Sequence, residues 1–119
     1  IEDTVFTIQN KNSKIKTLRI TIQEVENYSK YTKVGRLDPM YVKYQATVGN
    51  DFISPSYLTK NVWVDSNHKK NYVIYDGTIK AMDTVKVALS LYVDYSELDN
   101  SYQNTGFIGT IKIYVETKK

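Results

Sequence analysis

Hydrophobic and polar residues alternate most regularly in the last third of the chain, over residues 84–116. Two runs follow this rule, and a polar link over residues 96–105 separates them. The positions that share one face of each run are Val85, Val87, Leu89, Leu91 and Val93, and then Phe107, Gly109, Ile111, Ile113 and Val115. A period of two is typical of a β-strand with one buried face and one solvent face. The pattern therefore predicts two long, half-buried strands at the end of the chain.

Shorter stretches of the same kind predict strands over residues 4–9, 15–26, 40–48, 62–64, 71–75 and 78–81. In the second of these, Leu18, Ile20 and Ile22 face inward, and residues 27–39 and 49–60 are expected to be loops. Asp76-Gly77 stands between two β-forming stretches. Such a pair favours the type I′ turn of a β-hairpin, because that turn needs positive φ at both central residues.

The predicted strands follow one another without crossover helices, which indicates antiparallel sheets. Strands with a single apolar face need a second apolar layer, so two sheets must pack face to face. We therefore expect an all-β fold, a two-sheet antiparallel β-sandwich of the jelly-roll or immunoglobulin-like kind. Its 119 residues form a single domain, residues 1–119, which is long enough to bury about two thirds of its unfolded surface.

Composition narrows the partners that the domain can have. The chain contains no cysteine, so neither disulfides nor thiolate chemistry can contribute. The net charge is +3, and the basic residues are scattered instead of forming a stripe, so no nucleic-acid partner is expected. No apolar run is long enough to span a membrane.

The inventory of catalytic groups is also short. His68 is the single histidine, and it stands among the polar and basic residues of segment 65–70, so we expect it in an exposed turn. A Ser-His-Asp site would depend on this residue alone, and neither a zinc motif nor a phosphate-binding loop occurs. The sequence therefore predicts a protein that is not an enzyme and that needs no cofactor.

Acidic residues gather once, in the polar link, at Asp94, Glu97 and Asp99 with Asn100 beside them. One interpretation is that these residues cap two strands and remain in solvent. The alternative is a calcium site, because calcium takes oxygen ligands from such loops. The spacing matches no known calcium loop and no glycine supplies a sharp turn, so the first interpretation is favoured.

The chain is rich in tyrosine, with 11 Tyr and one Trp. Tyr44 is placed in the core by its phase, whereas Tyr92 and Tyr114 fall on the polar faces of the two last strands. If these two were neighbours across adjacent strands, they would form an exposed aromatic patch suited to a partner. Cross-strand packing is the simpler interpretation of the tyrosines, and carbohydrate binding is the alternative.

Three short segments resemble the camelysin/TasA-like family of secreted biofilm-matrix and surface proteins of Gram-positive bacteria. They are YDGTIKA at 75–81 followed by DTV at 83–85, LDNSYQN at 98–104, and TVFTIQNKNS at 4–13. The resemblance implies a jelly-roll-like sandwich, export from the cell, and assembly into fibres by exchange of an N-terminal strand. The alanine-rich start and the small-residue ending of that family are absent here.

These observations predict a secreted or cell-surface, non-enzymatic structural protein, such as a biofilm-matrix or fibre subunit that assembles through its sheet edges. Thr4, Phe6 and Ile8 lie on the strand that would be donated or would flank the acceptor groove, because sandwich edges carry unpaired backbone groups. The expected partners are other copies of the chain or other surface proteins. The alternative is an adhesin or carbohydrate-binding module of a larger surface protein, with a host protein or a glycan as its partner.

Overall fold

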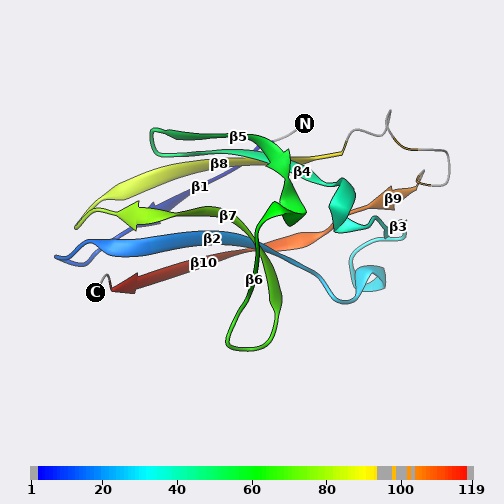
Figure 1. The fold of residues 1–119 in the computed structure, drawn as a ribbon, viewed down its shortest axis with the longest axis horizontal. Coiled ribbons are helices and arrows are strands. Elements are labelled where there is room, and N and C mark those ends of the chain that lie inside the picture. The colour runs from blue at the N-terminus through cyan, green and yellow to red at the C-terminus, as the bar shows by residue number, and fades with distance from the viewer. Residues whose placement is uncertain (1–2, 94–97, 99–101, 103, 118–119) are drawn as a thin grey trace.

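The computed structural model describes residues 3–93, 98, 102 and 104–117 and contains two four-stranded antiparallel sheets packed face to face (Figure 1). The predicted all-β sandwich is thus confirmed. The first sheet holds, in spatial order, β1 (Thr4–Gln9), β8 (Thr84–Tyr92), β4 (Lys43–Val48) and β5 (Asp51–Tyr57). The second sheet holds β10 (Gly109–Thr117), β2 (Lys16–Glu24), β7 (Lys70–Ile79) and β6 (Val62–Val64).

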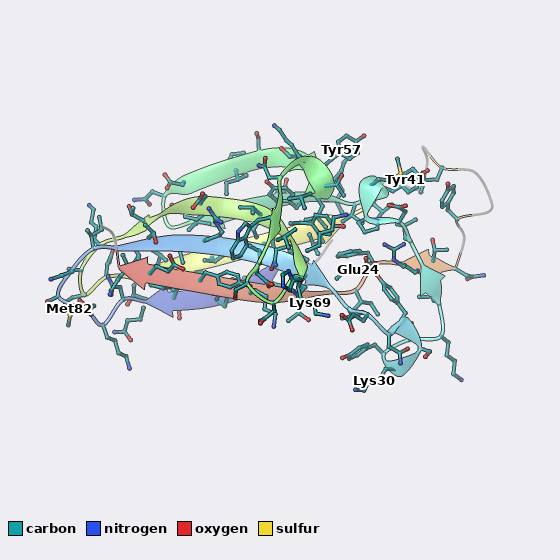
Figure 2. All side chains as sticks on the ribbon, turned by 60° about the horizontal axis from the view of Figure 1, so that its bottom comes forward. Glu24, Lys30, Tyr41, Tyr57, Lys69 and Met82 are labelled. Atoms are coloured by element: carbon teal, nitrogen blue, oxygen red, sulfur yellow. The ribbon has the colours of Figure 1, made fainter. Side chains whose placement is uncertain are left out.

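A smaller extension projects from one end of the sandwich. There β3 (Gly35–Arg36) and β9 (Thr105–Gly106) form a short parallel pair. Among the residues that the structure describes, the single-turn 3₁₀ helices are η1 (Tyr28–Lys30), η2 (Pro39–Tyr41) and η3 (Leu58–Lys60). Figure 2 shows Met82 at one tip of the molecule and Lys30 at the opposite end, in this extension.

The core fills the space between the sheets, and its residues are those on one face of each alternating strand. Leu18 and Ile20 of β2 and Val87 of β8 are completely buried, and Tyr44 retains only 5% of its exposure. Burial of an aliphatic side chain of this size contributes about 1.5–3 kcal/mol relative to exposure. The buried apolar set is Ile8, Leu18, Ile20, Ile22, Leu37, Val42, Tyr44, Ala46, Val48, Leu58, Tyr72, Ile74, Ile79, Val87 and Leu89.

The predicted loop over residues 49–60 is partly wrong, because Asp51–Tyr57 forms β5. The Gly49 turn is correct: this glycine has a φ of +59°, and the chain reverses there into β5. Pro55 has no N–H to offer a ladder, and it is tolerated because β5 is the edge strand beyond β4.

The predicted hairpin at Asp76-Gly77 is also wrong, because β7 runs through both residues without turning. Asp76 lies opposite Arg19 and Gly77 opposite Leu18, so pairing with the long strand β2 outweighs the local turn preference. Gly77 leaves room for the Tyr75 ring: an added Cβ would lie 2.5 Å from the Tyr75 hydroxyl oxygen and would displace that side chain. The true turn follows at residues 80–83, where Met82 has a φ of 59°.

Candidate functional site

The only histidine is placed as predicted, in an exposed turn. His68 has a φ of 62° in the connection between β6 and β7, and its backbone N–H donates to the Asp65 carbonyl at 3.0 Å. Within the described residues no group of three or more histidines and carboxylates is arranged to hold a metal ion. The calcium candidates Asp94, Glu97, Asp99 and Asn100 lie outside the described residues.

Tyr92 and Tyr114 do not form one aromatic patch. Tyr92 lies on β8 of the first sheet, opposite Lys43, whereas Tyr114 lies on β10 of the second sheet, opposite Arg19. Each projects from the outer face of its own sheet, because its neighbours in sequence face the core. The two last long strands belong to different layers, and alternation along a strand cannot reveal this.

Tyr114 instead belongs to a polar network on the outer face of the second sheet. Thr21 and Asn71 are both completely buried there, and the Thr21 hydroxyl donates to Asn71 Oδ1 at 2.7 Å. Asn71 Nδ2 donates to Asp65 Oδ2 at 3.1 Å and to the Lys69 carbonyl at 3.1 Å. The Tyr114 hydroxyl lies 3.5 Å from both Asp65 Oδ2 and Asn71 Oδ1. This network fixes the β6–β7 connection to the sheet.

Asp65 is the charged centre of that network. The backbone N–H of Lys69 donates to Asp65 Oδ1 at 3.0 Å and that of Asn67 at 2.9 Å. These bonds, led by that from Lys69 and helped by the Asn71 amide, hold the pKa of the Asp65 carboxyl below its usual range. Asp65 is therefore a structural carboxylate that organises the turn.

A hollow of about 330 Å³ adjoins this network. Trp63 of β6 meets Tyr114 edge to face, with ring centroids 4.9 Å apart and planes at 90°. The Arg19 guanidinium lies 4.9 Å from the centre of the Trp63 ring, and Arg19 Nη2 is 3.0 Å from Asp76 Oδ2. The lining residues are Thr17, Arg19, Trp63, Asp76, Tyr114 and Glu116.

The sequence pointed to only part of this hollow. Tyr114 was placed on a polar face, but Trp63 lies in a strand of three residues and Arg19 and Asp76 are far apart in the chain. The hollow forms because the cross-strand register brings Arg19 opposite both Tyr114 and Asp76. In the sequence, the feature that could have indicated this hollow is the single Trp, which stands beside a polar turn.

The four edge strands differ in how well they are protected from pairing with another chain. β5 contains Pro55 and a register shift, and β6 has only three residues. β1 and β10 are regular, with six and nine residues, and neither contains proline or a register shift. Figure 1 shows β1 and β10 at the lower sides of their sheets, so both unprotected edges lie on the same side of the sandwich.

The β10 edge also exposes apolar side chains. Ile113 and Val115 lie opposite Ile20 and Leu18, so they belong to the face that looks toward the other sheet. They nevertheless keep 42% and 43% of their exposure. At this side the first sheet does not cover β10, and two β-branched residues are left beside unpaired backbone.

The residues proposed for interaction on the first strand share one face of β1 and become more buried along it. Thr4 is exposed, Phe6 is half-buried, and Ile8 is 7% exposed and part of the core. β1 pairs along its whole length with β8. Asn10 anchors the end of the strand, since its side-chain amide donates to the carbonyls of Lys14, Ile79 and Lys80 at 3.0–3.2 Å.

A cleft of about 740 Å³ lies where the extension joins the second sheet. Its centre is Glu24, which accepts from Arg36 Nε at 2.7 Å, from Arg36 Nη2 at 2.8 Å and from the Tyr28 hydroxyl at 2.6 Å. Burial, followed by the bond to Glu24, raises the pKa of Tyr28 to about 12. Lys69 and Glu26 form a further ion pair at the cleft. Because Arg36 and Tyr28 both bind Glu24, the residues around this cleft hold the extension against the second sheet.

No protein-family model, curated protein or solved structure matches this chain at a significant level. No helix in the part of the chain that the structure describes is long and apolar enough to cross a membrane.

Proposed function

We propose that this domain is a non-enzymatic structural protein of the cell surface or extracellular matrix, and that copies associate through the side formed by β1 and β10. The observation that carries the proposal is the asymmetry of the edges. Two edges are blocked by a proline or by shortness, while the two regular edges lie together on the other side (Figure 1). Unblocked edges offer backbone donors and acceptors to another strand.

The exposed apolar residues of β10 favour a second copy of the chain as the partner. Pairing at this edge would cover Ile113 and Val115, which are each more than 40% exposed. The extracellular location rests on the resemblance of segments 4–13, 75–85 and 98–104 to the camelysin/TasA-like family. That resemblance also supplies exchange of β1 as one way in which the copies could join.

The test compares two matched substitutions on opposite sides of the sandwich. Ile113→Lys places a charge on the open edge, and Val64→Lys places one on β6, where the replaced valine is 57% exposed. We expect Ile113→Lys to raise the concentration needed for association by roughly tenfold, which is about 1.4 kcal/mol. Val64→Lys should leave association unchanged. Light scattering over a concentration series and electron microscopy of fibres supply the measurements.

A disulfide distinguishes edge pairing from strand exchange. Val5 and Ala88 lie directly opposite each other on the outer face of the first sheet, and the chain has no other cysteine to interfere. The double variant Val5→Cys and Ala88→Cys, once oxidised, ties β1 to its own sheet. Loss of association that returns on reduction indicates exchange, and unchanged association indicates pairing at intact edges. A wild-type chain that remains monomeric at millimolar concentration contradicts both edge pairing and strand exchange.

A further inference from the structure

We infer that the hollow on the outer face of the second sheet is a binding site for a neutral saccharide, of the size of a mono- or disaccharide. The inference is independent of self-association, which uses the edge of β10 and the face turned toward the other sheet. The hollow uses the opposite face of β10, through Tyr114 and Glu116.

The shape and size of the hollow suit a small ligand. Its volume of about 330 Å³ lies at the lower end of the range of small-molecule sites, roughly 300–1,000 Å³. Four strands build it: Thr17 and Arg19 come from β2, Asp76 from β7, Trp63 from β6, and Tyr114 and Glu116 from β10. Groups carried on strands are held more firmly than groups on loops, so the site is preformed.

The aromatic part of the hollow provides the apolar contact. Trp63 and Tyr114 are both only partly buried, so each ring still presents surface to a ligand. Their edge-to-face packing, at 4.9 Å and 90°, fixes the orientation of both rings. A pyranose ring carries C–H groups on its faces and hydroxyls on its rim, and it therefore packs its face on an aromatic ring while its rim meets polar groups.

The polar part of the hollow provides both donors and acceptors. The carboxylates of Asp76 and Glu116 accept hydrogen bonds from hydroxyls, and the planar Arg19 guanidinium donates several in a fixed geometry. Arg19 binds Asp76 through one nitrogen, Nη2, which lies 3.0 Å from Asp76 Oδ2 in the part of the chain that the structure describes. Further N–H groups are available to the oxygens of a sugar.

The charge of the hollow argues for a neutral ligand. One arginine and two carboxylates give the lining a net charge of −1, which disfavours phosphate, nucleic acid and acidic sugars. A cationic ligand would be repelled by the Arg19 guanidinium, which lies 4.9 Å from the centre of the Trp63 ring. A neutral polyol is the remaining class that uses the aromatic and the polar groups together.

The test uses the single tryptophan of the chain, which stands in the hollow and reports on binding there. Maltose, cellobiose, lactose, diacetylchitobiose and mannobiose are titrated separately while Trp63 fluorescence is followed. We expect saturable change with at least one of these sugars, with a dissociation constant on the order of 1 mM. Backbone amide chemical shifts, recorded in the same titration, should move around Trp63, Arg19 and Tyr114.

Three variants test whether the sugar binds in the hollow. Asp76→Asn keeps the shape but removes the charge that orients Arg19, and it should weaken binding by about tenfold or more, as should Trp63→Ala. Tyr57→Ala removes a more exposed aromatic ring, 49% exposed, from the first sheet and should leave the affinity unchanged. Amide chemical shifts serve for all three variants, and Asp76→Asn remains informative if Trp63→Ala fails to fold.

Three results would overturn the inference. These are no saturable change with any of the five sugars, binding that Asp76→Asn leaves intact, and stronger binding of galacturonate or of lysine methyl ester than of every neutral sugar. Repeating the titration on Ile113→Lys separates this site from self-association. Binding should survive in that variant, because Ile113 does not line the hollow.

Discussion

The buried pair of Thr21 and Asn71 offers the sharpest test of what holds the outer layer of the second sheet. We expect Asn71→Ala to lower the free energy of unfolding by about 3 kcal/mol. The side chain makes three hydrogen bonds of 2.7–3.1 Å, to Thr21, to Asp65 and to the Lys69 carbonyl. Each contributes roughly 1 kcal/mol net, and the Thr21 hydroxyl left without a partner costs about 1–3 kcal/mol more. These contributions overlap, so their sum is an upper limit.

Urea unfolding, followed by circular dichroism and by Trp63 fluorescence, measures this loss. With a slope of about 1–3 kcal/mol per molar urea, the midpoint should fall by roughly 1–3 M. Asn50→Ala, in an exposed turn, is the control and should change stability by less than about 0.5 kcal/mol.

A double-mutant cycle tests the reasoning itself. Thr21→Val should destabilise the wild-type protein but should be nearly neutral in the Asn71→Ala background, because there the hydroxyl has already lost its acceptor. The loss of stability caused by Thr21→Val should therefore be at least about 1 kcal/mol larger in the wild-type protein than in the Asn71→Ala variant. Additive effects, or a loss below about 1 kcal/mol for Asn71→Ala, would refute the claim that this pair is a satisfied buried network.

Two further predictions concern Tyr28 and Gly77. The pKa of Tyr28 is raised from 10.0 to about 12, so the folded state keeps the hydroxyl proton to a higher pH than the unfolded state does. The stability that this raised pKa contributes is complete below pH 10 and is lost as the pH rises toward about 12. Tyr28→Phe should make the fall of the melting temperature over this interval less steep, and an unchanged fall would mean that Tyr28 is not its source. Gly77→Ala should destabilise by about 1 kcal/mol, because the new methyl group would lie 2.5 Å from the Tyr75 hydroxyl oxygen and would displace that half-exposed ring. Gly106→Ala, whose nearest neighbour lies at 3.5 Å, should be close to neutral in thermal unfolding, and equal losses for the two variants would contradict the steric explanation.

The fold class could be predicted because alternation marks strands that have one buried face. β1 and β6 were predicted with their observed bounds, and Leu18, Ile20 and Ile22 were correctly placed in the core. β5 was missed because it contains Pro55 and is held by pairing with β4, not by a pattern of its own. At Asp76-Gly77 the local turn signal was genuine, but the register with β2 overrides it.

The hollow could not be predicted because it depends on which strands become neighbours. Alternation placed Tyr114 on a polar face, yet Tyr92 carried the same signal and lies on the other sheet. Sheet order is determined by packing between distant segments, and a single sequence carries little information about it. Only the structure brings Trp63 across β7 and β2 to meet Tyr114.

The alternation of Ile113 and Tyr114 on β10 has a consequence for avidity. A second copy added at this edge would continue the second sheet, so the outer faces of both copies would form one surface. The two hollows would then lie on that one surface. A polymeric ligand that engages both hollows would meet the second at an effective concentration in the millimolar range, close to the single-site dissociation constant of about 1 mM, so the pair would hold it more tightly than one hollow alone.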